Sequence, residues 1–315
     1  MIDYLDEIVG QPIAKRFVRT ALKRGNLYNF LFVGPKGVGK RQFAFALART
    51  LDCPANSPNC IVIAPIPSKI KDKKDKIYAY TRQYLPDKPT IKLEDRASIL
   101  IEQIRDLIER LVHMPAAGSK RMVLILEADR MTDEAANCFL KTLEEPPVDT
   151  VFILTTSRPN FVLPTIQSRC QKILFTYLNN DQIKSIVFDG NDDFLIGSPG
   201  EIMRIRDNNT LENVLEIFKS APLSTNAAAG RAKQFQYTAV IDLLYQLMLL
   251  YRLTLYRKLN LPINTKFDPE ITRKANHTSL EKILQVLLAL NYNINNLEQN
   301  PNRLLLLLDV LTKLP

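Results

Sequence analysis

Residues 29–40 have the sequence NFLFVGPKGVGK, in which a short apolar segment leads into a glycine-rich turn and a lysine. The apolar segment 29–33 is predicted to form a strand, and residues 39–50 are predicted to form a helix. This order of elements is the context of a P-loop, where glycines let backbone N–H groups face a phosphate and the lysine reaches its outer oxygens. The candidate nucleotide-binding residues are Gly34, Gly37, Gly39 and Lys40.

The P-loop lies in a region, residues 1–175, that alternates short apolar segments with helical patterns. Such alternation is typical of a parallel α/β sheet, whose strands are apolar on both faces because helices cover both sides. We expect strands at 29–33, 61–64, 121–126, 151–155 and 171–175, and helices at 12–24, 39–50, 99–113 and 133–145. The predicted fold class of this region is α/β.

A lysine-rich stretch at 69–76 lies within an insertion, residues 65–97, that interrupts the alternation. We expect the insertion to be a solvated surface loop, with contact to a partner as the alternative. After residue 175 the strand patterns stop. Residues 176–222 are expected to form a small helical lid, with a turn at the GSPG sequence of 197–200.

The last part of the chain is predicted to be an all-α domain at 225–315. Its NAAAG sequence at 226–230 is interpreted as a hinge, and apolar residues then recur at three- and four-residue spacing. This spacing predicts a helical bundle. Because the bundle carries no catalytic constellation, its expected roles are packing and assembly.

Two positions that hold Mg²⁺ in working P-loop ATPases have different chemistry here. The residue after the P-loop lysine should supply a hydroxyl, but it is Arg41, and the acidic residue expected at the end of strand 121–126 is Leu126. A one-residue shift would bring Glu127 into the metal position, but Arg41 would remain. Because the metal neutralises charge that develops in phosphoryl transfer, loss of both groups predicts that hydrolysis has been abandoned.

The composition is that of a basic globular protein. The 315 residues contain 42 Lys plus Arg and 33 Asp plus Glu, a formal net charge of +9, which favours polyanionic partners such as nucleic acid. The sequence starts with acidic residues and has no apolar run as long as a membrane span. We therefore expect a cytoplasmic protein that does not associate with a membrane.

The cysteines and histidines do not form a recognisable metal or catalytic pattern. Cys53 and Cys60 follow the P-loop helix, but the further thiolates of a four-cysteine zinc site are absent, so zinc is not expected. His113 and His277 are far apart in the sequence and have no spacing typical of a metal site or a catalytic triad.

Several further motifs occur in a fixed order along the chain: VGQ at 9–11, DRMT at 129–132, FLKTLEEPP at 139–147, SRC at 168–170, GSPG at 197–200 and NPNRL at 300–304. With these motifs the chain resembles the delta-prime-type subunits of the bacterial DNA polymerase III clamp loader, which are AAA+ proteins. The resemblance covers the first 200 residues by motif and the remainder by its helical pattern. It implies an AAA+ nucleotide-fold domain, a helical lid and a C-terminal collar that holds subunits together.

The resemblance also implies the site residues. In the family the arginine of the SRC motif, here Arg169 between Ser168 and Cys170, projects across a subunit boundary toward ATP on the neighbouring subunit. A guanidinium suits this role because it is always charged and can bind two phosphate oxygens at once. Thr155 and Thr156 correspond to a phosphate-sensing position, with a structural role at a strand end as the open alternative. Glu201 stands where a working ATPase has arginine.

The leading hypothesis is a non-hydrolysing delta-prime-type subunit that needs no cofactor of its own. Its expected partners are the gamma/tau-type motor and delta subunits, the sliding clamp and primer-template DNA. Whether the P-loop still binds ATP or phosphate stays open at this point. The alternatives are an active AAA+ motor subunit and a stand-alone DNA-binding module with a vestigial nucleotide fold.

Overall fold

The computed structural model describes residues 2–25, 27, 29–67, 70, 74–87, 97–115, 118–187, 198–207, 211–235, 240–261, 263, 265, 267–297 and 302–315. The chain forms two compact units. The first contains Met1–Ile186 and Gly197–Gly200, and the second contains Val187–Ile196 and Glu201–Pro315.

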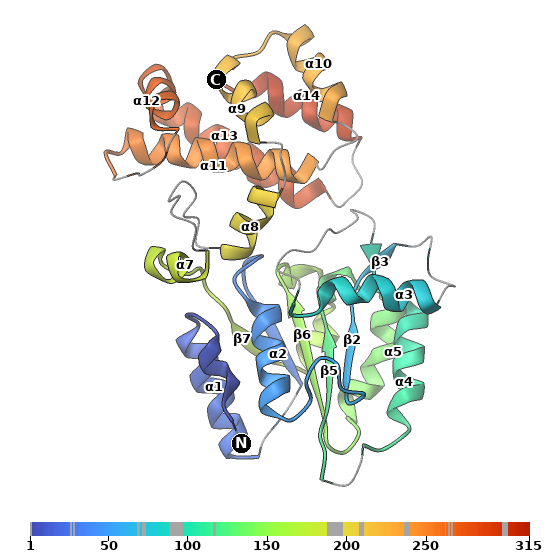
Figure 1. The fold of residues 1–315 in the computed structure, drawn as a ribbon. Coiled ribbons are helices and arrows are strands. Elements are labelled where there is room, and N and C mark those ends of the chain that lie inside the picture. The colour runs from blue at the N-terminus through green and yellow to red at the C-terminus, as the bar shows by residue number, and fades with distance from the viewer. Residues whose placement is uncertain are drawn as a thin grey trace. The chain divides into compact units, whose positions relative to one another are not determined.

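The first unit is built on a five-stranded parallel sheet with the strand order β2-β5-β6-β1-β7 (Figure 1). Its strands are β1 (Phe30–Val33), β2 (Cys60–Ile63), β5 (Arg121–Ile125), β6 (Thr150–Thr156) and β7 (Gln171–Leu174). β1 lies between β6 and β7, and its first residue, Phe30, is opposite Ile153 on one side and Gln171 on the other. The predicted α/β class is confirmed. We expected each strand to be covered on both faces. β7 is instead an edge strand, in which Ile173 is buried and the other three residues are exposed.

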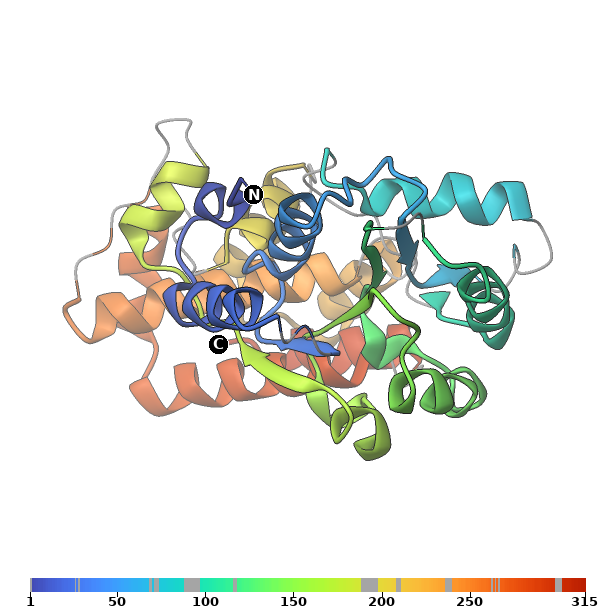
Figure 2. The same cartoon turned by 90° about the horizontal axis from the view of Figure 1, so that it is seen from below.

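Helices cover the sheet on both faces, because successive side chains of a strand point to opposite sides. The helices of this unit are η1 (Tyr4–Glu7), α1 (Pro12–Lys23), α2 (Lys40–Thr50), α3 (Lys74–Thr81), η3 (Arg82–Tyr84), α4 (Ile101–Leu111), η4 (Ala128–Arg130), α5 (Asp133–Glu144), η5 (Pro159–Phe161), α6 (Pro164–Gln167) and α7 (Asn180–Ile186). Leu31 of β1 shares a buried cluster with Leu107 of α4 and Phe139 of α5. On the other face, Phe32 makes an edge-to-face contact with Phe43 of α2, with 5.5 Å between the ring centroids. Figure 2 shows α1 beside β7, which it contacts.

The 65–97 insertion contains more regular structure than the expected loop. β3 (Ile66–Pro67) pairs antiparallel with β4 (Ala97–Ser98), and α3 and η3 lie between them in the sequence. Tyr84 is fully buried, and its hydroxyl donates to the carbonyl of Pro65 at 3.4 Å. The loop prediction is therefore wrong for residues 74–84, where a buried aromatic ring anchors the segment. Lys69, Lys71 and Lys73 lie outside the described residues.

The second unit is helical throughout its described residues. Most of α8 (Pro199–Asp207) belongs to it, together with α9 (Leu211–Ser220), α10 (Thr225–Phe235), α11 (Val240–Lys258), α12 (Asp268–His277), α13 (Leu280–Asn296) and α14 (Arg303–Lys313). α11 packs against α12 and α13, and α10 packs against α14, as expected of a helical bundle at 225–315. α9, which was expected to belong to the lid, also packs against α11. None of the described helices combines the length and the apolar character that a membrane span needs.

Two local predictions in this half are wrong. The hinge expected at 226–230 lies inside α10, where Ala228 and Ala232 are buried. Alanine is the strongest helix former, and one glycine in a helix costs only about 1 kcal/mol, so packing of the alanines decides the structure. The turn expected at 197–200 is instead the start of α8, which includes Pro199 and Gly200, and Gly197 lies outside the described residues.

A buried lysine joins three segments of the second unit. The ammonium of Lys274 in α12 donates to the carbonyls of Ala221 and Pro315, each at 2.8 Å, and lies 5.3 Å from the ring centroid of Phe218. Lys274 is 9% exposed. Burial, and to a lesser extent the charge of Arg273, lowers the pKa of Lys274 to about 8 from the ordinary 10.5.

This lowered pKa predicts how stability depends on pH. Between pH 8 and 10.5 the unfolded chain holds more protons at this position than the folded chain, so the contribution of Lys274 to the free energy of unfolding rises as pH rises. We expect the difference in unfolding free energy between wild type and Lys274→Met, measured by urea titration, to grow across this interval. Lys233→Met, which removes an exposed lysine of α10, is the control. A constant difference for Lys274→Met would contradict the prediction.

Candidate functional site

The P-loop has the backbone that its glycines predict. Gly37 and Gly39 have positive φ values of 75° and 96°, which other residues adopt only with strain, and Gly39 caps the start of α2. At Gly34 the chain runs so close to Phe175, the residue after β7, that a Cβ atom would lie 2.3 Å from the carbonyl oxygen of Phe175. The structure therefore brings together the glycines and the lysine expected to cradle phosphate.

Lys40 is directed back onto the loop that precedes it. Its ammonium donates to the carbonyls of Gly34 and Pro35, each at 2.6 Å, and the residue is 9% exposed. A phosphate bound at this loop would compete with these carbonyls for the ammonium.

The P-loop also contacts the start of α8 within the first unit. The Ser198 hydroxyl donates to the carbonyl of Lys36 at 2.6 Å, and the Gly200 N–H donates to the carbonyl of Gly37 at 3.0 Å. A Cβ atom at Gly200 would lie 2.8 Å from the Cα of Gly37, so only glycine allows this approach. Glu201, the next residue, is buried and belongs to the second unit.

Arg41 occupies the first turn of α2, where a metal-binding hydroxyl is expected. Arg41 is half-buried, and burial lowers the pKa of its guanidinium, while the charges of Glu127, Tyr84 and Asp87 act in the opposite direction. A fixed cation at this point repels a divalent cation and adds positive potential next to the P-loop.

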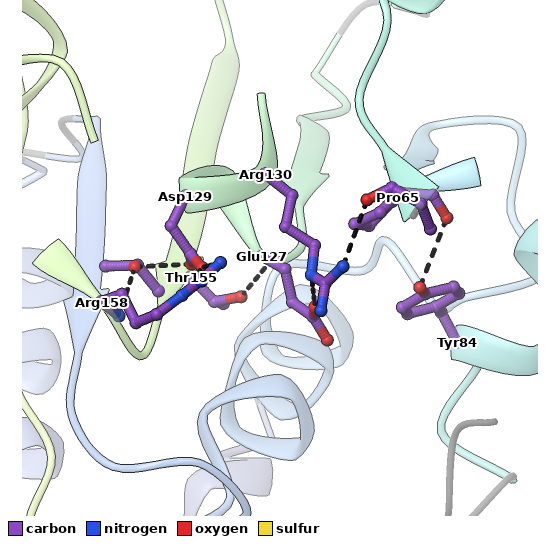
Figure 3. A network of polar contacts seen from close by, with 9 residues as sticks. Pro65, Tyr84, Glu127, Asp129, Arg130, Thr155 and Arg158 are labelled. Carbon is purple, nitrogen blue, oxygen red and sulfur yellow. Dashed lines mark hydrogen bonds and ion pairs between the residues drawn. The ribbon is translucent and has the colours of Figure 1, made fainter. Parts of the chain in front are cut away.

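The second expected metal position is apolar. Leu126, 2% exposed, follows β5, and its N–H donates to the carbonyl of Ile63 at 2.8 Å. The next residue, Glu127, forms an ion pair with Arg130, with 2.9 Å between Oε2 and Nε (Figure 3). To occupy the metal position by the one-residue shift considered above, the Glu127 carboxylate would therefore have to break its ion pair with Arg130.

The threonines at the end of β6 make hydrogen bonds within the chain. The Thr155 hydroxyl oxygen accepts from the Glu127 N–H at 3.1 Å, and the Thr156 hydroxyl donates to Asp129 at 2.6 Å. Asp129 also accepts from Nε and Nη2 of Arg158, at 2.9 and 2.7 Å (Figure 3). These contacts favour the structural alternative for both threonines.

Arg169 lies at the surface, between α6 and β7. Its guanidinium forms an ion pair with Glu144, the last residue of α5, and donates to the carbonyl of Thr165 at 2.8 Å. The exposed fractions of the two side chains are 31% for Arg169 and 47% for Glu144. The expected cation is therefore accessible from outside the chain.

The neighbours of Arg169 in the SRC motif have structural contacts. The Ser168 hydroxyl donates to the carbonyl of Thr165 at 3.0 Å. Cys170 is buried, and this burial raises the pKa of its thiol to about 12, so the thiol is not a reactive nucleophile. The Cys53 thiol donates to the carbonyl of Lys120 at 2.9 Å. In the described part of the chain, His, Cys, Asp and Glu residues form no group that could hold a metal.

The sequence did not single out several residues that organise these sites. Arg130 and Arg158 form ion pairs with Glu127 and Asp129, the carboxylates that follow β5. Asn29 holds the backbone at Arg169. Asn29 was predicted only as the first residue of the strand 29–33, whereas β1 starts at Phe30. Arg130 was visible only as part of the DRMT motif, without its pairing to Glu127 three residues earlier. Arg158 carried no signal, because its pairing with Asp129 depends on the fold.

The parallel sheet, the P-loop after β1 and the helical second unit together define a P-loop protein of the AAA+ class. A family model described as "DNA polymerase III, delta subunit" matches residues 10–179, more than half of the chain. The chain therefore belongs to this family.

Two relatives and one solved structure are similar to this chain. The DNA polymerase III subunit delta' of Pseudomonas aeruginosa is 35% identical over 144 residues, which cover 45% of this chain and 40% of the relative. The DNA polymerase III subunit gamma/tau of Mycobacterium tuberculosis is 31% identical over 182 residues, which cover 55% of this chain and 28% of the relative. The matches thus span less than half the length of these relatives. A solved gamma subunit-related protein of Thermotoga maritima aligns over 95% of this chain and 97% of its own, with 18% identity and a TM-score of 0.49.

The Asp129–Arg158 pair predicts a stability effect. The side chains are 3% and 19% exposed, so replacing Asp129 with Ala leaves a largely buried guanidinium without its carboxylate. We expect Asp129→Ala to lower the free energy of unfolding by about 3 kcal/mol. Lys120→Ala breaks an exposed pair with Asp149 and should cost less than about 1 kcal/mol. Urea unfolding measures both, and equal small losses would contradict the prediction.

Proposed function

We propose that this chain is a non-hydrolysing, delta-prime-type subunit of a DNA polymerase III clamp loader. In this proposal Arg169 acts on ATP held by a neighbouring subunit, and the P-loop of this chain does not take part in hydrolysis. The expected partners are gamma/tau-type motor and delta subunits, the sliding clamp and primer-template DNA. The family match and the gamma/tau and delta' relatives support membership of such an assembly.

The observation that carries the proposal is the separation of Arg169 from the P-loop of its own chain. β1 and β7 are parallel, and Arg169 precedes the start of β7, while the P-loop follows the end of β1. The four residues of β1 span about 13 Å, so the two sites lie at opposite ends of the strands, Arg169 at their N-terminal ends and the P-loop at their C-terminal ends. This position supports a role of the partly exposed guanidinium on a phosphate of another molecule rather than on one in its own P-loop.

The chemistry around the P-loop supports the non-hydrolysing assignment. Arg41 and Leu126 replace the two groups that would hold Mg²⁺, and the Glu127 carboxylate is engaged in an ion pair with Arg130. Without a metal, the phosphoryl-transfer transition state loses several kcal/mol of charge stabilisation. These features argue against the alternative of an active motor subunit.

An apolar stripe on α13 supports assembly through the second unit. Leu280, Leu284, Leu288 and Tyr292 recur every four residues and are between 40% and 70% exposed. Residues at this spacing lie on one face of a helix, and a contiguous exposed apolar surface is typical of a protein–protein interface. This stripe favours a subunit of a complex over a stand-alone DNA-binding module.

The idle P-loop predicts an absence of turnover. The purified chain, with Mg²⁺, ATP and primed DNA, should hydrolyse ATP no faster than its Lys40→Ala variant, because neither protein holds the metal that catalysis needs. The measurement is phosphate release over time, with an assembled motor subunit as the positive control. A rate that disappears in Lys40→Ala would identify an active ATPase and contradict the proposal.

If Arg169 acts on ATP of the neighbouring subunit, replacing it should lower the rate of ATP hydrolysis by the assembled complex. In a clamp loader reconstituted with Arg169→Ala, DNA- and clamp-stimulated hydrolysis by the neighbouring subunit should fall at least about tenfold, since an arginine finger stabilises transition-state charge. Gel filtration should show normal assembly. Arg16→Ala, which removes an exposed arginine of α1, is the matched control. An unchanged rate with Arg169→Ala would exclude the role.

A further inference from the structure

The guanidinium of Arg169 has a defined set of contacts within its own chain. Its Nε donates to Oε1 of Glu144 at 2.8 Å, and its Nη2 donates to the same oxygen. Its Nη1 donates to the carbonyl of Thr165 at 2.8 Å and makes a longer contact, 3.4 Å, with the Ser168 hydroxyl. Glu144 therefore binds the Nε–Nη2 edge of the guanidinium.

Counting donors shows what this arrangement leaves for a ligand. A guanidinium has five N–H groups in a planar fork. Glu144 takes one N–H from Nε and one from Nη2, and Thr165 takes one from Nη1. Within the contacts of the described residues, one N–H remains on each terminal nitrogen, apart from the long contact of Nη1 with Ser168. Two N–H groups on the terminal nitrogens are the pair that binds two phosphate oxygens at once.

The position of Glu144 relative to Arg169 is itself fixed by a buried amide. Asn29, which precedes β1 and is 7% exposed, donates through Nδ2 to the carbonyl of Leu143 at 2.8 Å and to the carbonyl of Arg169 at 3.3 Å. The end of α5, which carries Glu144, is thus held against the backbone of Arg169. Asn29 therefore holds in place the backbone segments from which the Glu144 carboxylate and the Arg169 guanidinium extend.

The pair is poorly suited to a role in stability. Both side chains are partly exposed, and exposed ion pairs contribute little to folding. Holding an arginine side chain in one orientation costs conformational entropy. If a neighbouring carboxylate already orients the side chain, this entropy is lost before a ligand binds, and ligand binding does not bear the cost. The contacts of Glu144 orient the arginine without covering its terminal nitrogens.

We propose that Glu144 is a positioning residue for Arg169: it holds the Nε–Nη2 edge so that the terminal N–H groups face the phosphates of ATP on the neighbouring subunit. This inference rests on the proposed function of Arg169. Glu144 does not touch the nucleotide and acts only through the guanidinium. The neighbouring Glu145, which is also exposed, makes none of the contacts described for Glu144.

The test uses the reconstituted clamp loader and the kinetics of ATP hydrolysis stimulated by DNA and the clamp. We expect Glu144→Ala to lower kcat about tenfold, because a misoriented catalytic group loses much of its effect. The KM for ATP should stay unchanged, since the interaction strengthens only in the transition state. Glu144→Gln keeps an oxygen that accepts from Nε and should recover part of the rate. Glu145→Ala removes the same charge one residue away and should behave as wild type.

A double-variant cycle separates the two proposals. In the Arg169→Ala background, Glu144→Ala should cause no further loss, and thermal unfolding of each variant shows that the fold is intact. If Arg169→Ala has no effect, the function proposed for Arg169 fails. If Arg169→Ala lowers the rate but Glu144→Ala leaves it unchanged or raises it, the positioning role of Glu144 alone is overturned. An equal loss from Glu144→Ala in both backgrounds also overturns it.

Discussion

The pairing of β1 with β6 on one side and β7 on the other is the constraint on which both sites depend. After its last residue, β1 passes into the P-loop, where the Gly34 N–H donates to the carbonyl of Thr156 at the end of β6. Before its first residue stands Asn29, whose carbonyl accepts from the Gln171 N–H at the start of β7. One buried strand therefore sets the position of the P-loop and of Arg169, and it keeps them at opposite ends of the parallel strands.

The strands and the P-loop were predictable because local sequence encodes them. A buried parallel strand must be apolar along its length, and a phosphate-binding turn needs glycine at positions of positive φ, as at Gly37 and Gly39. The errors arose where local composition is ambiguous. Residues 226–230 combine helix-forming alanines with a glycine, and only the burial of Ala228 shows that packing favours the helix. Similarly, the buried ring of Tyr84 could not be inferred from a charged, proline-rich segment.

The candidate sites were predictable in their motif residues but not in the partners of those residues. Arg41, Leu126 and Arg169 each occupy a position with a fixed place in a motif, so their chemistry could be compared with what that place requires. Asp129 and Arg158 are 29 positions apart, and Glu144 and Arg169 are 25 positions apart. Such contacts arise only when the sheet brings loops from different strands together. A single sequence contains no periodicity or spacing that reports them.

The contacts of Ser198 and Gly200 with the P-loop have a mechanical consequence. They engage the carbonyls of Lys36 and Gly37 on the loop, while Lys40 engages those of Gly34 and Pro35. Bonds supplied by the chain itself thus engage four consecutive carbonyls of the loop, those of residues 34–37. In the proposed assembly, these bonds would let the subunit present the same surface to its neighbours throughout a catalytic cycle.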